Sequence, residues 1–150
     1  MNYTSESEFG ISYATDNSAG LDLPFYDPEV EEVVAKPGER VSLKTGIAIE
    51  FPEGTYGEID SRSSTSKLLL LPLCRTIDGD YRGNIRTVFV NTGTEDVVIK
   101  RGDYLFQIVI KPYTTVLPFR VSQGELTQTV RGDKGFGHSG RGAVLTKEEI

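Results

Sequence analysis

Short stretches in which apolar residues occupy every second position recur along the chain. Examples are GIAIEF at 46–51, NIRTVF at 84–89 and YLFQIVI at 104–110. A period of two places alternate side chains on one face of a strand, so each stretch predicts a β-strand with one buried face. Apolar residues at helical spacing do not persist over three turns, and the best helix candidate is the short SSTSKLLLL stretch that begins at Ser63. The pattern therefore predicts an all-β chain.

Turn sequences separate the predicted strands and contain glycine, proline, asparagine or aspartate. They are KPGE at 36–39, FPEG at 51–54, NTGTED at 91–96 and KRGD at 100–103. Many short strands joined by tight turns are typical of an antiparallel sandwich or barrel.

The chain has 150 residues, which is the usual size of one domain, and it contains no internal repeat or linker. We expect a single domain over 1–150, with a flexible N-terminus at 1–8. The glycine-rich run RGDKGFGHSGRG at 131–142 has too little apolar content for a core, so a mobile C-terminal arm and tail are expected over 129–150.

Charge and composition exclude several function classes. Twenty-two acidic and 16 basic side chains give a net charge of −6, which repels DNA and anionic membranes, so a nucleotide partner must meet a local basic patch. One cysteine and one histidine exclude an intramolecular disulfide and a Cys/His zinc site, but leave oxygen ligands for a metal possible. No apolar run approaches the length of a membrane-spanning helix. We expect a soluble, cytoplasmic protein with no direct DNA binding.

The C-terminal arm is the first candidate for chemistry. Arg131, Lys134 and Arg141 surround one aromatic residue, Phe136, and bare backbone amides beside guanidinium groups suit a phosphate chain. A tail with solvated charges is the alternative, and it is favoured when this stretch is considered alone.

Arg62, Ser63 and Ser64 precede the candidate helix, where a guanidinium, two hydroxyls and free N–H groups would bind one anion. An ordinary serine cap beside a surface arginine explains the same residues.

The segment TIDGDYRGN at 76–84 holds the densest cluster of reactive groups. In a strand-turn-strand, Asp78 and Asp80 would lie on one side and Tyr81 on the other. Asp78 suits a base at the floor of a pocket, whereas a hairpin turn explains Asp80 as well. Asp22, between two leucines, is either the partner of an arginine or part of a metal's second shell.

Taken in order, these segments resemble the five signature motifs of the trimeric dUTPase family. The matching stretches are AGLDL at 19–23, GEIDSRSS at 57–64, IDGDYRG at 77–83, RGDYLFQIVI at 101–110 and RGDKGFGHSG at 131–140. The resemblance implies a jelly-roll-like antiparallel β subunit and a homotrimer with active sites at subunit interfaces. It also implies Mg²⁺-dependent hydrolysis of dUTP to dUMP and pyrophosphate, which limits uracil in DNA and supplies dUMP for thymidylate synthesis.

The resemblance assigns a role to each matching residue. Asp78 corresponds to the general base, and Tyr81 to the residue under the deoxyribose that leaves no room for a 2′-hydroxyl. The backbone of Thr76 and Ile77 reads the uracil edge, and Asp22 meets Mg²⁺ through water. The residues that match the phosphate-binding positions are Arg62, Ser63, Ser64 and Gln107. The remaining matching residues lie on an arm contributed by a neighbouring subunit. Arg131 binds the γ-phosphate, Phe136 stacks on uracil, and the region of Gly137 and Ser139 wraps the phosphates.

The chain departs from the family pattern at several positions. Asp60 and Ser61 replace the usual Ala-Pro, and a carboxylate so near the phosphates is expected to lower affinity or alter metal use. Arg75 stands where glycine is common. An arginine is usual at Tyr104, and a serine at His138.

Two other functions fit parts of the sequence. A dCTP deaminase shares the fold and the Arg-Ser-Ser element but relies on a glutamate at a position that holds Val88 here. A non-catalytic nucleotide-binding module with a regulatory protein partner would use the same fold.

Overall fold

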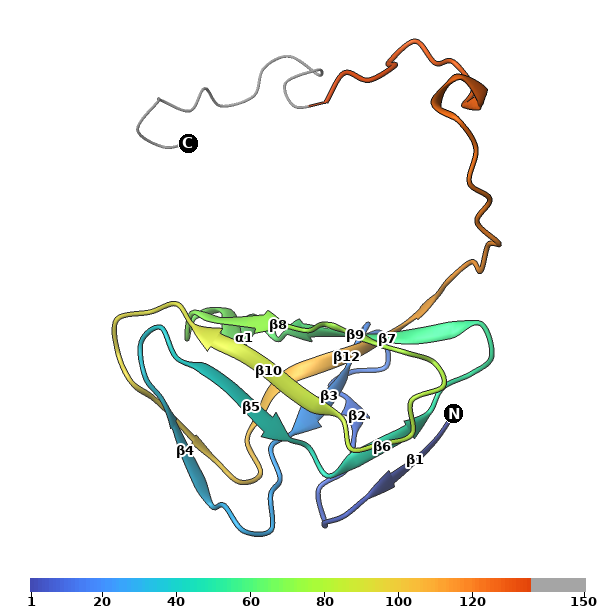
Figure 1. Cartoon of the computed structure of the whole chain (residues 1–150). Coiled ribbons are helices and arrows are strands. Elements are labelled where there is room, and N and C mark those ends of the chain that lie inside the picture. Colours follow the sequence, from blue (N-terminus) through green and yellow to red (C-terminus); the bar gives the residue numbers. More distant parts are fainter. Residues whose placement is uncertain (136–150) are drawn as a thin grey trace. The chain divides into compact units, whose positions relative to one another are not determined.

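The three alternating stretches are strands in the computed structural model, which describes residues 1–135 (Figure 1). They are β6 (Ile47–Glu50), β10 (Arg86–Asn91) and β12 (Tyr104–Pro112). As the alternation predicts, β6 and β12 bury the side chains of one face, such as Ile47 and Ile49 in β6, whereas in β10 the consecutive residues Thr87, Val88 and Phe89 are all buried.

The other strands are also short. Their bounds are β1 (Asn2–Ser5), β2 (Ser12–Tyr13), β3 (Leu21–Pro24), β4 (Glu32–Ala35), β5 (Arg40–Lys44), β7 (Thr55–Ser61), β8 (Leu70–Leu73), β9 (Thr76–Ile77) and β11 (Val97–Lys100). Two single-turn helices, α1 (Ser63–Ser66) and η1 (Gln123–Glu125), complete the described elements.

Every strand pair in residues 1–135 is antiparallel. The largest sheet has the order β2-β3-β12-β7-β9 and a second sheet has the order β5-β10-β8, while β1-β6 and β11-β4 form two-stranded ribbons. Neighbours in each sheet are mostly distant in sequence, which is typical of a jelly-roll-like arrangement. The predicted all-β fold is thus confirmed.

The core lies between the two larger sheets. Phe89 of β10 and Phe106 of β12 are almost fully buried, and their ring centroids are 5.3 Å apart. Burial of such aromatic rings is a main source of stability in a core of this kind.

The chain divides into two compact units, Met1–Thr115 and the part from Val116 onward. All core residues belong to the first unit. In the described part of the second, η1 is stabilised by a capping box between Ser122 and Glu125, and the apolar side chains of Val116, Leu117 and Phe119 are exposed. No helix among residues 1–135 is long and apolar enough to cross a membrane. The arm over 129–150 stays a prediction.

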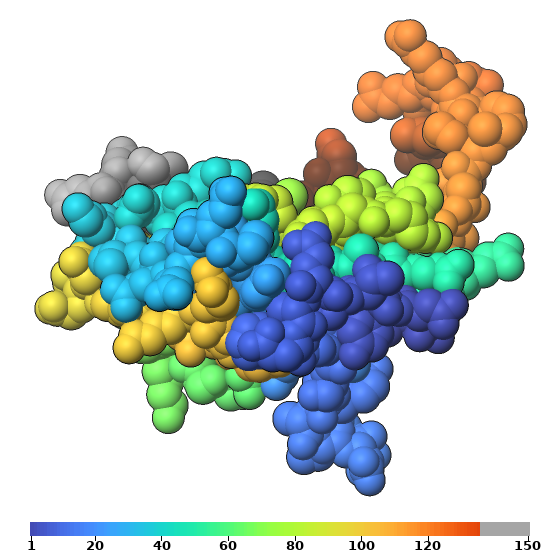
Figure 2. All heavy atoms as spheres, turned by 90° about the horizontal axis from the view of Figure 1, so that it is seen from below, coloured from blue at the N-terminus to red at the C-terminus, as the bar shows by residue number. Residues whose placement is uncertain are grey.

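The N-terminus contains a strand that the sequence pattern does not predict. Residues 2–5, within the stretch expected to be flexible, form β1 and pair with β6 from Asn2↔Glu50 to Ser5↔Ile47. Figure 2 shows these dark-blue residues at the surface of the first unit. A strand with all four side chains exposed carries no alternation for the sequence to reveal.

The candidate helix at Ser63 is a single turn, because Leu69 adopts a left-handed conformation (φ 56°) and β8 begins at the next residue. Its N-cap is Arg62, and no serine side chain caps it. Thr65, buried within α1, donates its hydroxyl to the Leu105 carbonyl of β12 and so attaches the helix to the largest sheet.

Candidate active site

The residues expected to bind the base and sugar lie around one pocket. Thr76, Ile77, Asp78 and Tyr81 line a pocket of about 260 Å³. Its other lining residues are Cys74, Arg86 and Val88. Asp78 follows β9 directly, so a two-residue strand paired with β7 at Gly57↔Ile77 sets its place.

The segment TIDGDYRGN begins with the two residues of β9 and continues as a loop, and it is not a hairpin. β9 pairs with β7, whereas β10 pairs with β5 and β8. The expectation that Tyr81 points away from Asp78 is therefore wrong, because strand alternation does not apply in a loop. Asp78 and Tyr81 line the same pocket, while Asp78 and Asp80 together line a neighbouring one and Asp80 also lines a third.

Local hydrogen bonds fix the Tyr81 ring. The Tyr81 amide donates to the Asp78 carbonyl (3.1 Å), and the Tyr81 hydroxyl donates to the Asn84 carbonyl (3.0 Å). A Cβ at Gly83 would lie 2.5 Å from the Tyr81 hydroxyl oxygen, so only glycine permits this close approach.

The Asp78 carboxylate is exposed, and it forms no hydrogen bond or ion pair with another group in the described part of the chain. An acceptor without a partner at the edge of a pocket is suited to bind and deprotonate a water.

A second group of predicted residues lies on the largest sheet. Asp22 of β3, Gln107 of β12 and Asp60 of β7 are adjacent across the three strands. The Arg62 Nε lies 3.1 Å from Asp22 Oδ1, and Arg62 Nη1 donates to the Tyr104 carbonyl (2.6 Å). Of the two roles left open for Asp22, the structure thus shows the arginine partner.

Gln107 supports this group. Its Nε2 donates to the Ser61 carbonyl (3.1 Å), immediately before Arg62. Ser63 and Ser64 are exposed at the start of α1. The pocket around Asp78 contains none of these residues.

The extra carboxylate of Asp60 is paired. Arg75 Nη2 lies 3.3 Å from Asp60 Oδ2 and 2.6 Å from Glu58 Oε1, and its Nε donates to the Ile59 carbonyl (2.9 Å). The two departures at positions 60 and 75 thus compensate each other. Lys111 Nζ also contacts Glu58 (2.9 Å) and, as the main cause, holds the pKa of that carboxyl below its ordinary value.

Tyr104, which replaces a usual arginine, has a structural role. Its hydroxyl donates to the Gly10 carbonyl (3.1 Å). Burial, and secondarily the nearby Asp22 carboxylate, raise the pKa of this phenol.

Only part of the predicted arm can be described. Arg131 donates from Nε to the Lys134 carbonyl (3.0 Å) within a local turn. Phe136, Gly137, His138 and Ser139 lie outside the described residues.

No group of three His, Cys, Asp or Glu side chains within residues 1–135 is arranged to hold a metal. The one carboxylate predicted to act near a metal, Asp22, already contacts Arg62. This fits a carboxylate that accepts hydrogen bonds from metal-bound water and does not itself bind a metal.

Comparison with known proteins identifies relatives along nearly the whole chain. The dUTPase family model matches residues 10–140. The deoxyuridine 5′-triphosphate nucleotidohydrolase of Anaplasma marginale is 45% identical over 132 residues, which cover 86% of this chain and 87% of the relative. The enzyme of the same name from Clostridium kluyveri is 43% identical over 131 residues, covering 85% and 87%.

Solved structures agree. A Staphylococcus bacteriophage 80alpha dUTPase mutant with dUpNHpp has a TM-score of 0.79 and 26% identity, covering 93% of this chain and 97% of the phage chain. A dUTPase mutant from S. aureus phage phi11, described with a structural Mg(II) ion, has a TM-score of 0.72 and 25% identity, covering 83% of this chain and 98% of the phage chain.

Proposed function

The chain belongs to the dUTPase family and hydrolyses dUTP to dUMP and pyrophosphate, and we propose that Asp78 activates the attacking water. The observation that carries this assignment is the position of its carboxylate. It is exposed, has no partner within residues 1–135 and lines the pocket that also contains Tyr81. In this mechanism the Asp78 carboxylate takes a proton from water as the water attacks the α-phosphorus, and pyrophosphate leaves on the opposite side.

The pocket itself accounts for the choice of nucleoside. The backbone of Thr76 and Ile77 offers hydrogen-bonding groups to the uracil edge, and the ring of Tyr81 packs against the deoxyribose. Because hydrogen bonds at both ends of the loop hold that ring, it cannot easily move away from a 2′-hydroxyl. This pocket would therefore exclude ribonucleotides by steric contact.

In this mechanism the phosphates of dUTP bind near the Asp22–Arg62 pair. Arg62, Ser63 and Ser64 offer a guanidinium and two hydroxyls, and Gln107 keeps the preceding Ser61 in place. Mg²⁺, held mainly by the triphosphate, would neutralise charge on the leaving pyrophosphate. Asp22 would orient metal-bound water while fixing Arg62.

We further propose that the active protein is a homotrimer. Within one chain the Asp78 pocket contains no residue of the Asp22–Arg62 group, so a site built from two chains would unite them. The exposed side chains of Val116, Leu117 and Phe119 support contact with another copy, because apolar groups so open to water favour burial at an interface. Arg131, Phe136, Gly137 and Ser139 would complete the site from a neighbouring copy. Such an enzyme acts where deoxynucleotides are made, so we place it in the cytoplasm.

The competing deaminase function is disfavoured by the pocket wall. Val88, at the position where that function needs a glutamate, is buried and lines the Asp78 pocket. An apolar side chain there cannot transfer protons.

Pyrophosphate release from a panel of deoxynucleoside triphosphates and UTP tests the function. We expect rapid release from dUTP alone, with light scattering reporting a trimer. Ammonia release from dCTP would contradict the dUTPase assignment, and full activity of a monomer would contradict the shared site.

A further inference from the structure

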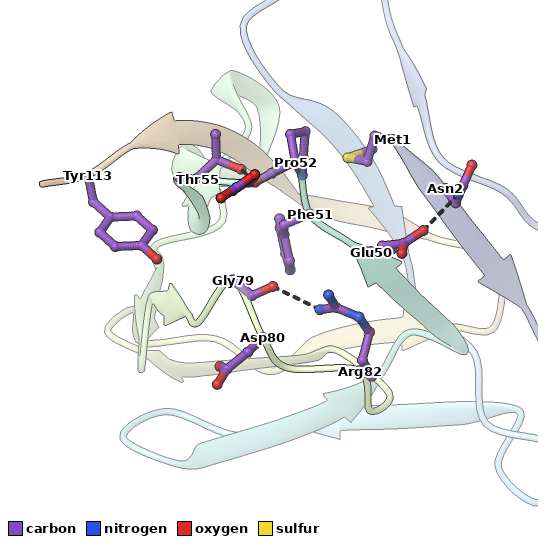
Figure 3. Close-up of a pocket in the computed structure, with 12 residues that line it drawn as sticks. Met1, Asn2, Glu50, Phe51, Pro52, Thr55, Gly79, Asp80, Arg82 and Tyr113 are labelled. Carbon is purple, nitrogen blue, oxygen red and sulfur yellow. Dashed lines mark hydrogen bonds between the residues drawn. The ribbon is translucent and has the colours of Figure 1, made fainter. Parts of the chain in front are cut away.

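A second pocket, of about 580 Å³, lies beside the loop that carries Asp78 and Tyr81 (Figure 3). Its walls are formed by the N-terminal residues, the turn after β6, Tyr113 and three loop residues, Gly79, Asp80 and Arg82. Arg82 is exposed at this pocket, but its side chain still contacts the loop. Its guanidinium turns back toward Gly79, as Figure 3 shows.

Arg82 holds the loop by two charge-assisted hydrogen bonds. Its Nη1 donates to the Gly79 carbonyl (2.8 Å) and to the Tyr81 carbonyl (3.0 Å). Gly79 follows Asp78 directly, and the second acceptor is the carbonyl of Tyr81 itself. One guanidinium therefore restrains the backbone next to both residues. Bonds from an ionised donor are stronger than those between neutral groups.

The guanidinium has other acceptors nearby that it does not use. Glu50, Glu53 and Asp80 line the same pocket, yet no carboxylate in the described part of the chain forms an ion pair with Arg82. Asn2 donates to Glu50 instead (2.7 Å). The positive charge of Arg82 is thus committed to the loop carbonyls.

The remaining contacts of the loop cannot replace this restraint. The Asn84 side chain accepts from the Thr45 and Gly46 amides (3.2 Å each), which fixes the far end of the loop. A Cβ at Gly79 would collide with the Thr55 carbonyl, so the loop lies directly against the first residue of β7. Between these points, Arg82 supplies the side-chain contacts to the Gly79 and Tyr81 carbonyls, while the Tyr81 hydroxyl contacts the Asn84 carbonyl at the far end of the loop.

We propose that Arg82 is a positioning residue that holds Asp78 and Tyr81 in one arrangement, and thereby couples turnover to sugar selectivity. The inference rests on the proposed roles of those two residues. Arg82 does not line the pocket of about 260 Å³, and it is not one of the residues proposed to bind the phosphates. It therefore acts through the loop backbone.

The test compares Arg82→Ala and Arg82→Lys with the wild type in steady-state kinetics on dUTP and UTP. Because small displacements of a reacting group are costly, Arg82→Ala should lower kcat for dUTP roughly 10- to 100-fold. The preference for dUTP over UTP should fall in the same variant. Arg82→Lys keeps the charge but not the planar guanidinium, and should lie between the two in both measurements.

Arg101→Ala is the matched control. Arg101 also donates to two backbone carbonyls, of Asp27 (3.0 Å) and Pro28 (3.2 Å), but outside the loop and both pockets. It should lower the melting temperature without changing kcat or sugar preference.

Wild-type values of both kcat and preference in Arg82→Ala, or in Arg82→Lys if the alanine variant does not fold, would overturn the inference. A change in only one of the two would also overturn it. Failure of the wild type to hydrolyse dUTP would instead contradict the proposed function, so the two failures are distinguishable.

Discussion

Asp22 and Asp78 are both carboxylates of the candidate site, but the protein holds them in opposite ways. Asp22 lies within β3 between two buried leucines, and its carboxylate contacts Arg62 at 3.1 Å. Asp78 follows the two-residue strand β9 and is exposed, with no partner for its carboxylate within residues 1–135.

The difference assigns the two roles. In the proposed mechanism, the Asp22 oxygen that accepts from Arg62 fixes a cation for phosphate binding, and strand register across β3, β12 and β7 holds it there. The oxygens of Asp78 remain available for water, and a loop braced by local hydrogen bonds positions them. If both proposed roles hold, long-range strand pairing supports substrate binding, whereas local contacts support the chemical step.

Removing the predicted arm tests whether stability and turnover depend on different parts of the chain, and it should have the largest effect. Truncation after Gln128 should leave the melting temperature unchanged, because every core residue lies in the first unit. Turnover of dUTP should fall roughly 100-fold, since positioning contacts to the triphosphate and uracil are lost. Calorimetry beside steady-state kinetics measures both. Unfolding of the truncated trimer would make the segment structural.

Breaking the ion pair tests the binding region. Arg62→Gln should raise KM for dUTP roughly 10-fold by loss of a charged hydrogen bond to phosphate. It should also lower the free energy of unfolding by about 1–3 kcal/mol, because the Asp22 carboxylate, 16% exposed, loses its partner. Adding Asp22→Asn should restore stability but not KM. A normal KM in the single variant would remove Arg62 from the phosphate site.

Truncating Tyr81 sharpens the account of the loop. Tyr81→Ala should relax discrimination against UTP roughly 10-fold, because the pocket no longer excludes a 2′-hydroxyl. Tyr81→Phe keeps the ring and serves as the control. Competition between dUTP and UTP measures the ratio, and unchanged selectivity in Tyr81→Ala would place the sugar elsewhere.

The smallest effect concerns pH. Lys111 lowers the pKa of Glu58 below its ordinary 4.5, so this pair adds stability above pH 4.5 that is lost as pH falls through the folded-state pKa. Glu58→Gln should therefore show a smaller loss of melting temperature between neutral pH and pH about 4 than the wild type. Equal losses would mean that other carboxylates dominate acid unfolding.

The alternation in β6, β10 and β12 predicted the fold because burial of one face leaves a period of two in the sequence. The motifs also predict Asp22, Arg62 and Asp78 as site residues, and these assignments stay predictions. The Arg75–Asp60 pair could not be predicted, since it joins a residue of β7 to a residue 15 positions away that comes just before β9. Cys74, with φ 49°, reverses the chain without a glycine to mark the turn. The bracing of Tyr81 by Asn84 also has no signature, because it uses a backbone carbonyl.

The turnover of Asp78→Asn tests the central claim most directly, with Asp80→Asn as the neighbouring control. The amide is nearly isosteric but cannot accept the proton of water, so kcat for dUTP should fall roughly 10²–10⁴-fold. Binding of a non-hydrolysable dUTP analogue and the melting temperature should remain those of the wild type, and Asp80→Asn should retain full activity. Undiminished turnover in Asp78→Asn would contradict the account and assign the water to another group.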